Sequence, residues 1–428
     1  MQKRIAPASS LSGEIELPGD KSISHRYAMI AAIAEGRTRI RNYSTGADCH
    51  STLRCLRALG VPVEGSGTEF TIDGCGLGGL RAPATALDAG NSGSTIRMLS
   101  GILAAQPFLS RIFGDESLSR RPMQRIMQPL TLMGAHIGAS EDRYPPLEIH
   151  GAPLHAIDYA LPVASAQVKT CVLFAGLFAE GRTSVTEPAP SRDHTEIALR
   201  EFGAEISVEG RKIAVTGRPQ LTARELYVPS DLSSAAFFLV AALLVPGSKL
   251  TIRGVGLNPT RSALLDFLSG MGAKIRIPDI ESRNGELIGE ILVEHSALKG
   301  GTIEGPLTAA LIDEIPVLAV LGAATEQGLT VKDASELRLK ETDRIRTVVD
   351  NLRRMGVDAQ ELPDGFVVPG RQTFHAARFD SYGDHRIAMA FAVAALHADG
   401  ESVIDGAESA SVSFPEFWQT LSAITRAV

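Results

Sequence analysis

The stretch Gly19–Ile40 reads GDKSISHRYAMIAAIAEGRTRI: a short polar signature, an apolar run of small residues, a Gly break and a short β-like run. The same layout recurs five more times along the 428-residue chain, with starts between 66 and 81 residues apart. The later copies begin at Gly90, Ala164, Ser230, Leu311 and Tyr382. Regular internal repetition indicates that one supersecondary unit is used several times. The sequence therefore predicts six copies of one unit.

A second kind of segment lies between the signatures. It is an amphipathic run that stops at Gly and is followed by β-type alternation, as in STLRCLRALGVPVE from Ser51 and HTEIALREFGAEISV from His194. Apolar residues three and four positions apart, closed by Gly, are typical of a helix and its C-terminal stop. Each unit is therefore expected to hold two helices with short strands between and after them.

Six units fill the chain and divide naturally into two domains of three. We expect the seam in the Pro-containing stretch Arg224–Ser230, ahead of the fourth signature. The β-like run Gly13–Leu17 precedes the first signature and is expected to complete the second domain, because chain termini often lie close together. We therefore predict an α/β protein with residues 19–228 in a first domain and residues 1–18 plus 229–428 in a second.

The apolar stretch Ala235–Val245 has no clear polar face and ends at Pro246. A helix that is apolar all round is buried in a core or a membrane, and this run is well short of the roughly 20 residues that a bilayer needs. Glu14, Glu16 and Pro18 lie where a signal peptide would need an apolar core. We therefore expect helices inside and sheets outside, no membrane segment, and a cytoplasmic location.

The composition is 44% hydrophobic and 21% charged, which is typical of a globular protein and excludes a disordered chain. The net charge of −7 does not favour nucleic-acid binding. Most of the cationic residues are Arg, whose planar fork grips carboxylate and phosphate, although surface arginines without such a role would give the same composition. The four cysteines form no CxxC pair or zinc-type cluster, so neither disulfides nor structural zinc are expected.

Each signature lies at a predicted helix start, where unpaired N–H groups and the helix dipole favour anions. The signature side chains that suit anionic ligands are Lys21, Ser22 and Arg26; Asn91 and Arg97; Ser165, Gln167 and Lys169; Asp231; Asp313; and Asp384, His385 and Arg386. The alternative is that Ser, Asp and Asn at these positions are plain N-caps. That alternative does not explain why basic residues accompany them so often.

Two further places carry candidate chemistry. Lys340 and Arg344 would bind phosphate while Glu341 supplies a proton, unless this segment is only a solvated helix end with a Glu341 to Arg344 ion pair. Asp313 lies within an apolar stretch and is a candidate base, unless Asp313 or Glu314 simply caps the helix that follows. There is no GxxxxGK[ST] loop, HxxxH pair or nucleophile elbow, so metal and acyl-enzyme mechanisms are disfavoured.

With these residues in view, the sequence closely resembles the 5-enolpyruvylshikimate-3-phosphate synthase family along essentially the whole chain. The resemblance rests on PGDKSISHR from Pro18, LDAGNSGSTIR from Leu87, RRPM from Arg120, SAQVK from Ser165, LIDEIP from Leu311, LKETDR from Leu339 and YGDHRIAMAF from Tyr382. The strings GDKS, SAQVK, RDHTE (Arg192–Glu196) and NPTR (Asn258–Arg261) resemble markers of the family's second class.

The resemblance implies a two-domain enolpyruvyl transferase fold, in which each domain holds three βαβαββ-type units and the active site lies in the interdomain cleft. It implies transfer of the enolpyruvyl group of phosphoenolpyruvate to the 5-hydroxyl of shikimate 3-phosphate, with release of phosphate, in chorismate and aromatic amino-acid biosynthesis. It also implies a monomer with no cofactor or metal, and inhibition by glyphosate at the phosphoenolpyruvate site.

The resemblance carries site residues onto matching positions. Shikimate 3-phosphate would be bound by Lys21, Ser22, Arg26, Ser165, Ala166, Gln167, Arg192, Asp313 and Lys340. Phosphoenolpyruvate would be bound by Lys21, Gly93, Arg121, Gln167, Arg344 and Arg386. Asp313 would take the proton of the attacking hydroxyl, while Glu341, with Lys21 nearby, would protonate the methylene carbon.

One position departs from the family pattern. Many first-class members have a Lys just before a C-terminal Thr-Phe-Pro, where this chain has Val412 and Ser413. One basic contact in the phosphate pocket is therefore unassigned.

Two alternatives stay open. The related UDP-N-acetylglucosamine enolpyruvyl transferase shares fold and donor, but it typically has a Lys-Asn pair and a loop Cys where this chain has KSISHR and RRPM. A non-enzymatic six-unit interaction scaffold would have interchangeable signatures and no buried carboxylates.

Overall fold

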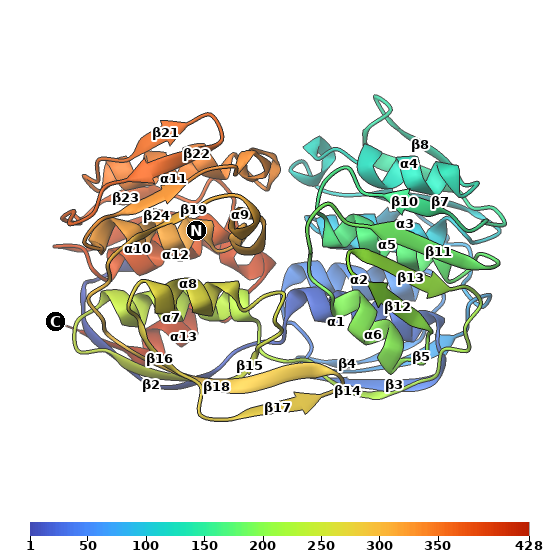
Figure 1. The fold of residues 1–428 in the computed structure, drawn as a ribbon, viewed down its shortest axis with the longest axis horizontal. Coiled ribbons are helices and arrows are strands. Elements are labelled where there is room, and N and C mark those ends of the chain that lie inside the picture. Colours follow the sequence, from blue (N-terminus) through green and yellow to red (C-terminus); the bar gives the residue numbers. More distant parts are fainter. Residues whose placement is uncertain (428) are drawn as a thin grey trace. The chain divides into compact units, whose positions relative to one another are not determined.

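The computed structural model describes residues 1–427 and divides into two compact parts (Figure 1). We call Gly19–Val228 with Arg283–Glu286 the first domain. The second domain comprises Met1–Pro18, Pro229–Ser282 and the chain from Leu287 onward. Within residues 1–427, no helix is both long enough and apolar enough to cross a membrane.

Three four-stranded sheets lie around the helices of the first domain. Their strand orders are β6 (Leu87–Asp88), β7 (Leu109–Phe113), β9 (Tyr144–His150), β8 (His136–Ser140); β10 (Asp158–Ala160), β11 (Arg182–Thr186), β13 (Lys212–Thr216), β12 (Ile206–Glu209); and β14 (Glu225–Tyr227), β3 (Glu35–Arg41), β5 (Glu69–Cys75), β4 (Val63–Ser66). In each sheet the first pair is parallel and the other two are antiparallel. The first domain therefore uses one topology three times.

The helices of the first domain are of two kinds. The largely buried ones are α1 (Lys21–Ile33), α3 (Gly93–Leu103) and α5 (Ala166–Gly176). The amphipathic ones are α2 (Ala47–Ala58), α4 (Gln124–Leu132) and α6 (His194–Glu201), with a short 3-10 turn η1 (Leu118–Arg120) before α4. Helix α3 packs against both α1 and α5, so the apolar signature helices form the centre of the domain.

The second domain repeats this plan. Its sheets run β16 (Lys274–Arg276), β18 (Glu286–Glu294), β15 (Lys249–Gly256), β2 (Ala8–Glu16), β25 (Thr425–Ala427), with β17 (Ile280–Arg283) beside β18; β19 (Gly301–Ile303), β20 (Leu329–Val331), β22 (Gly365–Val368), β21 (Gln360–Leu362); and β1 (Gln2–Ile5), β24 (Ser402–Asp405), β23 (Arg378–Asp380). The central helices are α7 (Leu232–Leu244), α10 (Ile315–Ala324) and α12 (His385–Ala395), which pack on one another.

The remaining helices of the second domain are α8 (Ala263–Gly270), α9 (Pro306–Leu311), α11 (Arg344–Arg354), α13 (Phe417–Ile424) and the 3-10 turns η2 (Ser335–Leu339) and η3 (Ala407–Val412). In Figure 1 the helices of this domain lie between the sheet containing β21 and β22 and the sheet containing β2, β15 and β18. Helices inside and sheets outside, as the sequence predicts, are confirmed for this domain.

Two strands are exchanged along the chain. Strand β2 precedes α1 yet pairs in parallel with β15 of the second domain, in which the sequence predicts the Gly13–Leu17 run. Strand β14 precedes α7 yet pairs in parallel with β3 of the first domain. Each of these strands supplies the parallel pairing in its sheet, and β2 also pairs antiparallel with β25.

The sixth unit departs from the predicted βαβαββ pattern. Its sheet has three strands in the order β1-β24-β23, and strand β25, which follows α13, pairs with β2 in another sheet. Strand β1 pairs antiparallel with β24. The N-terminus of the chain therefore completes the C-terminal unit.

The tip of the β17–β18 hairpin corrects the predicted domain boundary, because Arg283–Glu286 belong to the first domain. The Asn284 side chain accepts from the Tyr227 N–H at 3.0 Å and donates to Glu201 at 3.0 Å. The Glu286 carboxylate lies 2.7 Å from Nδ1 of His194, and both side chains are buried. No pattern in the sequence between residues 229 and 428 predicts the contacts of Asn284 and Glu286 with the first domain.

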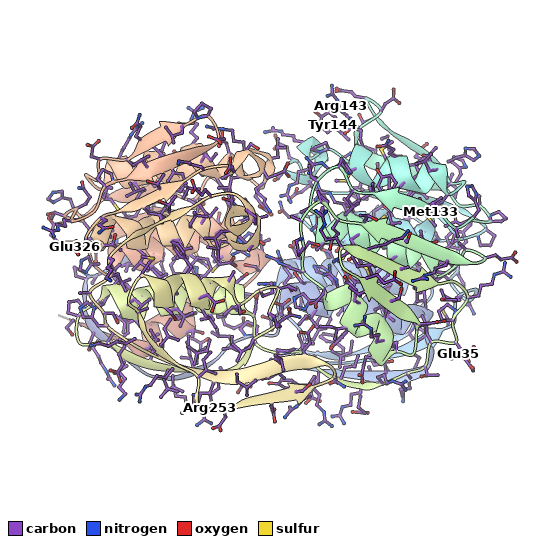
Figure 2. All side chains as sticks on the ribbon, in the orientation of Figure 1. Glu35, Met133, Arg143, Tyr144, Arg253 and Glu326 are labelled. Atoms are coloured by element: carbon purple, nitrogen blue, oxygen red, sulfur yellow. The ribbon has the colours of Figure 1, made fainter. Side chains whose placement is uncertain are left out.

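The outer faces of the sheets are charged. On β15, Ile252 and Val255 are buried while Arg253 is 56% exposed and lies at the outside of the sheet in Figure 2. Its guanidinium pairs with Glu14 of β2 and, at 3.5 Å, with Glu290 of β18. This alternation buries one face of the sheet against the helices and leaves the other in water.

Capping explains part of the signature pattern. Five signature residues each accept a hydrogen bond from a first-turn backbone N–H at 2.9 to 3.4 Å: Asp20, Ser92, Ser165, Asp231 and Asp384. At the fifth signature, Glu314 holds the N-cap position without such a bond. The N-cap alternative is therefore confirmed for five signatures, and it accounts for one polar residue in each.

A buried chain of polar side chains joins helices α1, α2 and α3. Nδ1 of His25 on α1 shares a 2.7 Å hydrogen bond with Thr52 on α2, and Thr52 shares one of 2.7 Å with Thr95 on α3. Thr95 donates to Ser92 at 2.8 Å. Burial, reinforced by the positive charges of Lys21 and Arg26, lowers the pKa of His25 well below its usual 6.5.

Helices α3 and α5 approach so closely at Gly101 that an added Cβ would lie 2.1 Å from the backbone oxygen of Cys171. Because both atoms belong to the backbone of packed helices, Gly101→Ala should lower the free energy of unfolding by about 2 kcal/mol. Urea unfolding measures the change. Gly270→Ala is the control, because its Cβ meets nothing within 4 Å and should change stability by no more than about 1 kcal/mol. Equal effects of the two changes would contradict the close approach.

The buried neutral His25 should make stability depend on pH. Below pH 6.5 the His25 imidazole is protonated in the unfolded chain but stays neutral in the folded chain. The free energy of unfolding therefore falls by about 1.4 kcal/mol for each pH unit below 6.5. His25→Asn keeps a polar atom near Thr52 and should abolish that loss. The difference in unfolding free energy between wild type and variant should therefore shrink from pH 7.5 to pH 5.5. The exposed His136→Asn serves as the control, and identical slopes in all three proteins would refute a neutral His25.

Candidate active site

Arg26 joins three helices of the first domain. Its guanidinium donates to Thr195 at 2.7 Å, to Thr170 at 2.9 Å and to the Ser22 carbonyl at 2.8 Å. The Ser22 hydroxyl accepts from Arg192 at 3.5 Å. The predicted residues of the GDKSISHR and RDHTE strings therefore lie together, although Arg26 is almost fully buried and acts here as a tie between helices.

Lys21 lies at the first residue of α1 and pairs with Asp48 of α2, with 2.9 Å between Nζ and Oδ2. The lysine is partly exposed, whereas the carboxylate is nearly buried. The Asp48 backbone oxygen also accepts from Thr95 at 3.4 Å. Asp48 therefore holds the Lys21 ammonium near the start of α3.

Gly93, the first residue of α3, lies beside two guanidinium groups. A Cβ at this position would be 2.8 Å from Arg97 and 3.5 Å from Arg121. Arg97 donates to Gln167 at 2.9 Å, and Gln167 donates to Ser94 at 3.0 Å. The N-terminal turns of α3 and α5 and the RRPM string therefore meet around one cationic, hydrogen-bonding surface.

Asp313 gathers the predicted residues of the second domain. Its carboxylate is 3.3 Å from Lys340, 3.7 Å from Arg344 and 4.0 Å from Arg386. Arg386 also donates to the Asp313 backbone oxygen at 2.8 Å. With 15% of its side chain exposed and three cations within 4 Å, Asp313 is an accessible carboxylate surrounded by positive charge.

Arg344 is 1% exposed and is held by two carboxylates. It donates to Asp384 at 2.8 and 3.2 Å and to Glu341 at 2.5 Å. Burial acts to lower the pKa of Arg344, but Asp384 and Glu341 outweigh it and hold the pKa above its usual value. Burial likewise opposes ionisation of Asp384, and Arg344 overcomes it to hold that pKa below its usual 3.8. The environment of the buried pair therefore favours the charged forms of both side chains.

The predicted site residues form one group in each domain. The first-domain group contains Lys21, Ser22, Arg26, Gly93, Arg121, Ser165, Ala166, Gln167 and Arg192. The second-domain group contains Asp313, Lys340, Glu341, Arg344 and Arg386. That the two groups face one cleft stays a prediction.

Three residues that organise these groups are absent from the substrate-binding residues that the family resemblance implies. Arg97 and Asp384 are among the signature residues that the sequence offers as candidates for anionic ligands. Asp48 lies in no recognisable pattern, so only the structure reveals its pairing with Lys21. Each of the three orients a predicted ligand-binding side chain.

The region with the missing basic residue is apolar in part. Val412 ends η3, and the nearby Phe414 is buried against Phe238 and Phe417.

Within residues 1–427, no three His, Cys, Asp or Glu side chains are grouped so as to hold a metal ion. All four cysteines are free thiols.

Known proteins were compared with this chain in sequence and structure. The sequence model of the family described as EPSP synthase (3-phosphoshikimate 1-carboxyvinyltransferase) matches residues 5–421. A 3-phosphoshikimate 1-carboxyvinyltransferase of Solibacter usitatus is 76% identical, covering 99% of this chain and 100% of the relative. The enzyme of that name from Koribacter versatilis is 54% identical over 98% of both chains.

A solved structure of EPSP synthase from Acinetobacter baumannii has a TM-score of 0.89 and 43% identity, covering all of this chain and 98% of the other. The fold therefore matches the one that the motifs implied. A family match over nearly the whole sequence, together with relatives of this identity, decides the family. The chain belongs to the EPSP synthase family.

Proposed function

We propose that this chain transfers the enolpyruvyl group of phosphoenolpyruvate to the 5-hydroxyl of shikimate 3-phosphate, using the two groups of residues described above. The observation that carries the proposal is the pair of carboxylates in the second domain. Asp313 is ringed by Lys340, Arg344 and Arg386, while Glu341 is bonded to Arg344. Two carboxylates that share the cation Arg344 suit one proton acceptor and one proton donor acting on anionic substrates.

The cations and helix starts bind the substrates. In the first domain, Lys21, Ser22, Arg26, Arg192 and the first turn of α5 (Ser165–Gln167) bind shikimate 3-phosphate, with Asp313 and Lys340 from the second domain. Phosphoenolpyruvate is bound by Lys21, Gly93, Arg121, Gln167, Arg344 and Arg386. Guanidinium groups suit this task because they grip carboxylate and phosphate through two parallel hydrogen bonds.

The reaction proceeds by addition and elimination. The oxygen of the 5-hydroxyl bonds to C2 of phosphoenolpyruvate while Asp313 accepts the proton of that hydroxyl. Glu341, with Lys21, delivers a proton to C3. The resulting tetrahedral ketal then loses phosphate from C2 and a proton from C3, which restores the double bond in the product. The surrounding cations stabilise the negative charge that develops on the phosphate and carboxylate oxygens.

We further propose that the enzyme is a cytoplasmic monomer. The family to which the chain belongs is the basis for this proposal. The UDP-N-acetylglucosamine transferase and the interaction scaffold are not supported, because the comparisons name 3-phosphoshikimate 1-carboxyvinyltransferases.

Asp313→Asn should lower kcat at least a hundredfold, because the amide keeps the shape of the side chain but cannot accept the proton. Binding of shikimate 3-phosphate should change by less than about tenfold, since the amide oxygen still accepts from Lys340. Steady-state kinetics and calorimetric titration measure the two effects. Asp358→Asn, an exposed change in the same domain, is the control and should leave both unchanged. Near-normal turnover of the Asp313 variant would overturn the assignment of the base.

Gly93→Ala should raise the inhibition constant of glyphosate at least tenfold, or about 1.4 kcal/mol. The new Cβ would lie 2.8 Å from Arg97 and 3.5 Å from Arg121, in the space between the two guanidinium groups. The KM for phosphoenolpyruvate should rise less, because the donor is shorter than glyphosate. Inhibition curves of wild type and variant at matched phosphoenolpyruvate saturation provide the test. Superimposed curves would show that Gly93 does not line this pocket.

A further inference from the structure

A buried cluster of charges lies beneath the first turn of α5 and takes no part in the mechanism above. Lys169 is 1% exposed, and its Nζ is 3.1 Å from Glu187 and 2.7 Å from Glu196. The three residues come from α5, from the segment that follows β11, and from α6. One side chain therefore joins three separate elements of the first domain.

Stability alone does not account for this cluster. Buried ion pairs are costly to desolvate, and well-packed apolar residues of similar size often stabilise a fold as well or better. Burial raises the pKa of Glu196 above its usual value in spite of the nearby Lys169, which shows how expensive the site is for a charge. The arrangement therefore calls for a role beyond stability.

Each member of the cluster is linked to a proposed substrate contact. The Lys169 N–H donates to the Ser165 carbonyl at 3.0 Å, within the turn that contains Gln167. Glu187 accepts from the hydroxyl of Ser191, the residue before Arg192. Glu196 lies four residues after Arg192 in the same RDHTE string, within the first turn of α6.

A second set of hydrogen bonds joins α5 and α6 next to the charged cluster. Thr170 and Thr195, each adjacent to a member of the charged cluster, share a hydrogen bond of 2.5 Å, and both accept from Arg26 of α1. Arg26 by itself would allow α5 and α6 to rotate about this point. The Lys169 ion pairs provide a second point of attachment, which fixes the rotation as well.

We propose that Lys169, with Glu187 and Glu196, is a positioning residue for shikimate 3-phosphate: it sets the first turn of α5 and the Arg192 segment in the relative geometry that binds this substrate. The inference rests on the proposed function, because it assumes that Ser165, Gln167 and Arg192 contact shikimate 3-phosphate. Lys169 itself touches no substrate.

The test compares binding with stability. Lys169→Met should weaken binding of shikimate 3-phosphate, titrated calorimetrically without phosphoenolpyruvate, at least tenfold. In steady-state kinetics the KM for shikimate 3-phosphate should rise while kcat falls less than threefold, since no proton-transfer group is lost. Lys169→Met leaves the buried Glu187 and Glu196 without their cation. The double variant Lys169→Met with Glu196→Gln neutralises one of these two carboxylates, so it should unfold at a higher temperature than the single variant and still bind weakly.

Controls separate positioning from a general loss of stability. Val172→Ala creates a cavity in the same buried helix and should lower the unfolding temperature without changing the dissociation constant. Glu196→Gln alone retains the ion pair between Lys169 and Glu187, so it should weaken binding less than Lys169→Met does. This variant provides the test of the inference if Lys169→Met does not fold. Binding within twofold of wild type in the folded double variant would overturn the inference.

Failure of the proposed function would look different. Arg192→Gln removes a proposed direct contact and should weaken binding of shikimate 3-phosphate at least tenfold. If Arg192→Gln weakens binding and the Lys169 variants do not, the positioning role is wrong and the site stands. If Arg192→Gln also leaves binding unchanged, the assignment of the site is wrong, and the positioning role falls with it.

Discussion

A helix without a polar face must be covered on every side, and this constraint shapes both domains. Helices α7, α10 and α12 are apolar all round and pack on one another, so sheets have to enclose them. The same requirement acts on α1, α3 and α5. Because the helices pack side by side, their first turns come within reach of one another, as the bond between Gln167 and Ser94 shows. The enclosure of apolar helices thereby brings together the polar signatures that precede them.

Charge in both groups is organised before any substrate arrives. Buried Asp384 orients Arg344, and nearly buried Asp48 orients Lys21, so each cation has its position fixed by a carboxylate behind it. A cation fixed in this way loses little freedom when it binds an anion, and it does not have to reorganise as charge develops. The cost is a set of buried carboxylates that the fold must keep ionised, which the low pKa of Asp384 reflects.

The repeated unit and the apolar helices were predictable from the sequence, because each depends on a local pattern, whereas the assignment of the site residues stays a prediction. The sheet of the sixth unit and the domain of Arg283–Glu286 were not predictable, because they depend on pairing between residues far apart in the chain. The same limit applies within the site. Glu341 and Arg344 are three residues apart and could be paired by spacing, whereas the partner of Lys21 lies on another helix in an unmarked segment.

The tip of the β17–β18 hairpin, Arg283–Glu286, belongs to the first domain, whereas the rest of the hairpin belongs to the second. This division limits where the chain can be cut to give separate domains. A polypeptide that stopped at Val228 would contain all three sheets of the first domain but not Asn284 and Glu286. His194 would lose the carboxylate beside its ring, and the Tyr227 N–H would lose its acceptor. The two domains are thus not interchangeable modules, and a fragment or chimera made at the obvious seam would have to carry the hairpin tip with it.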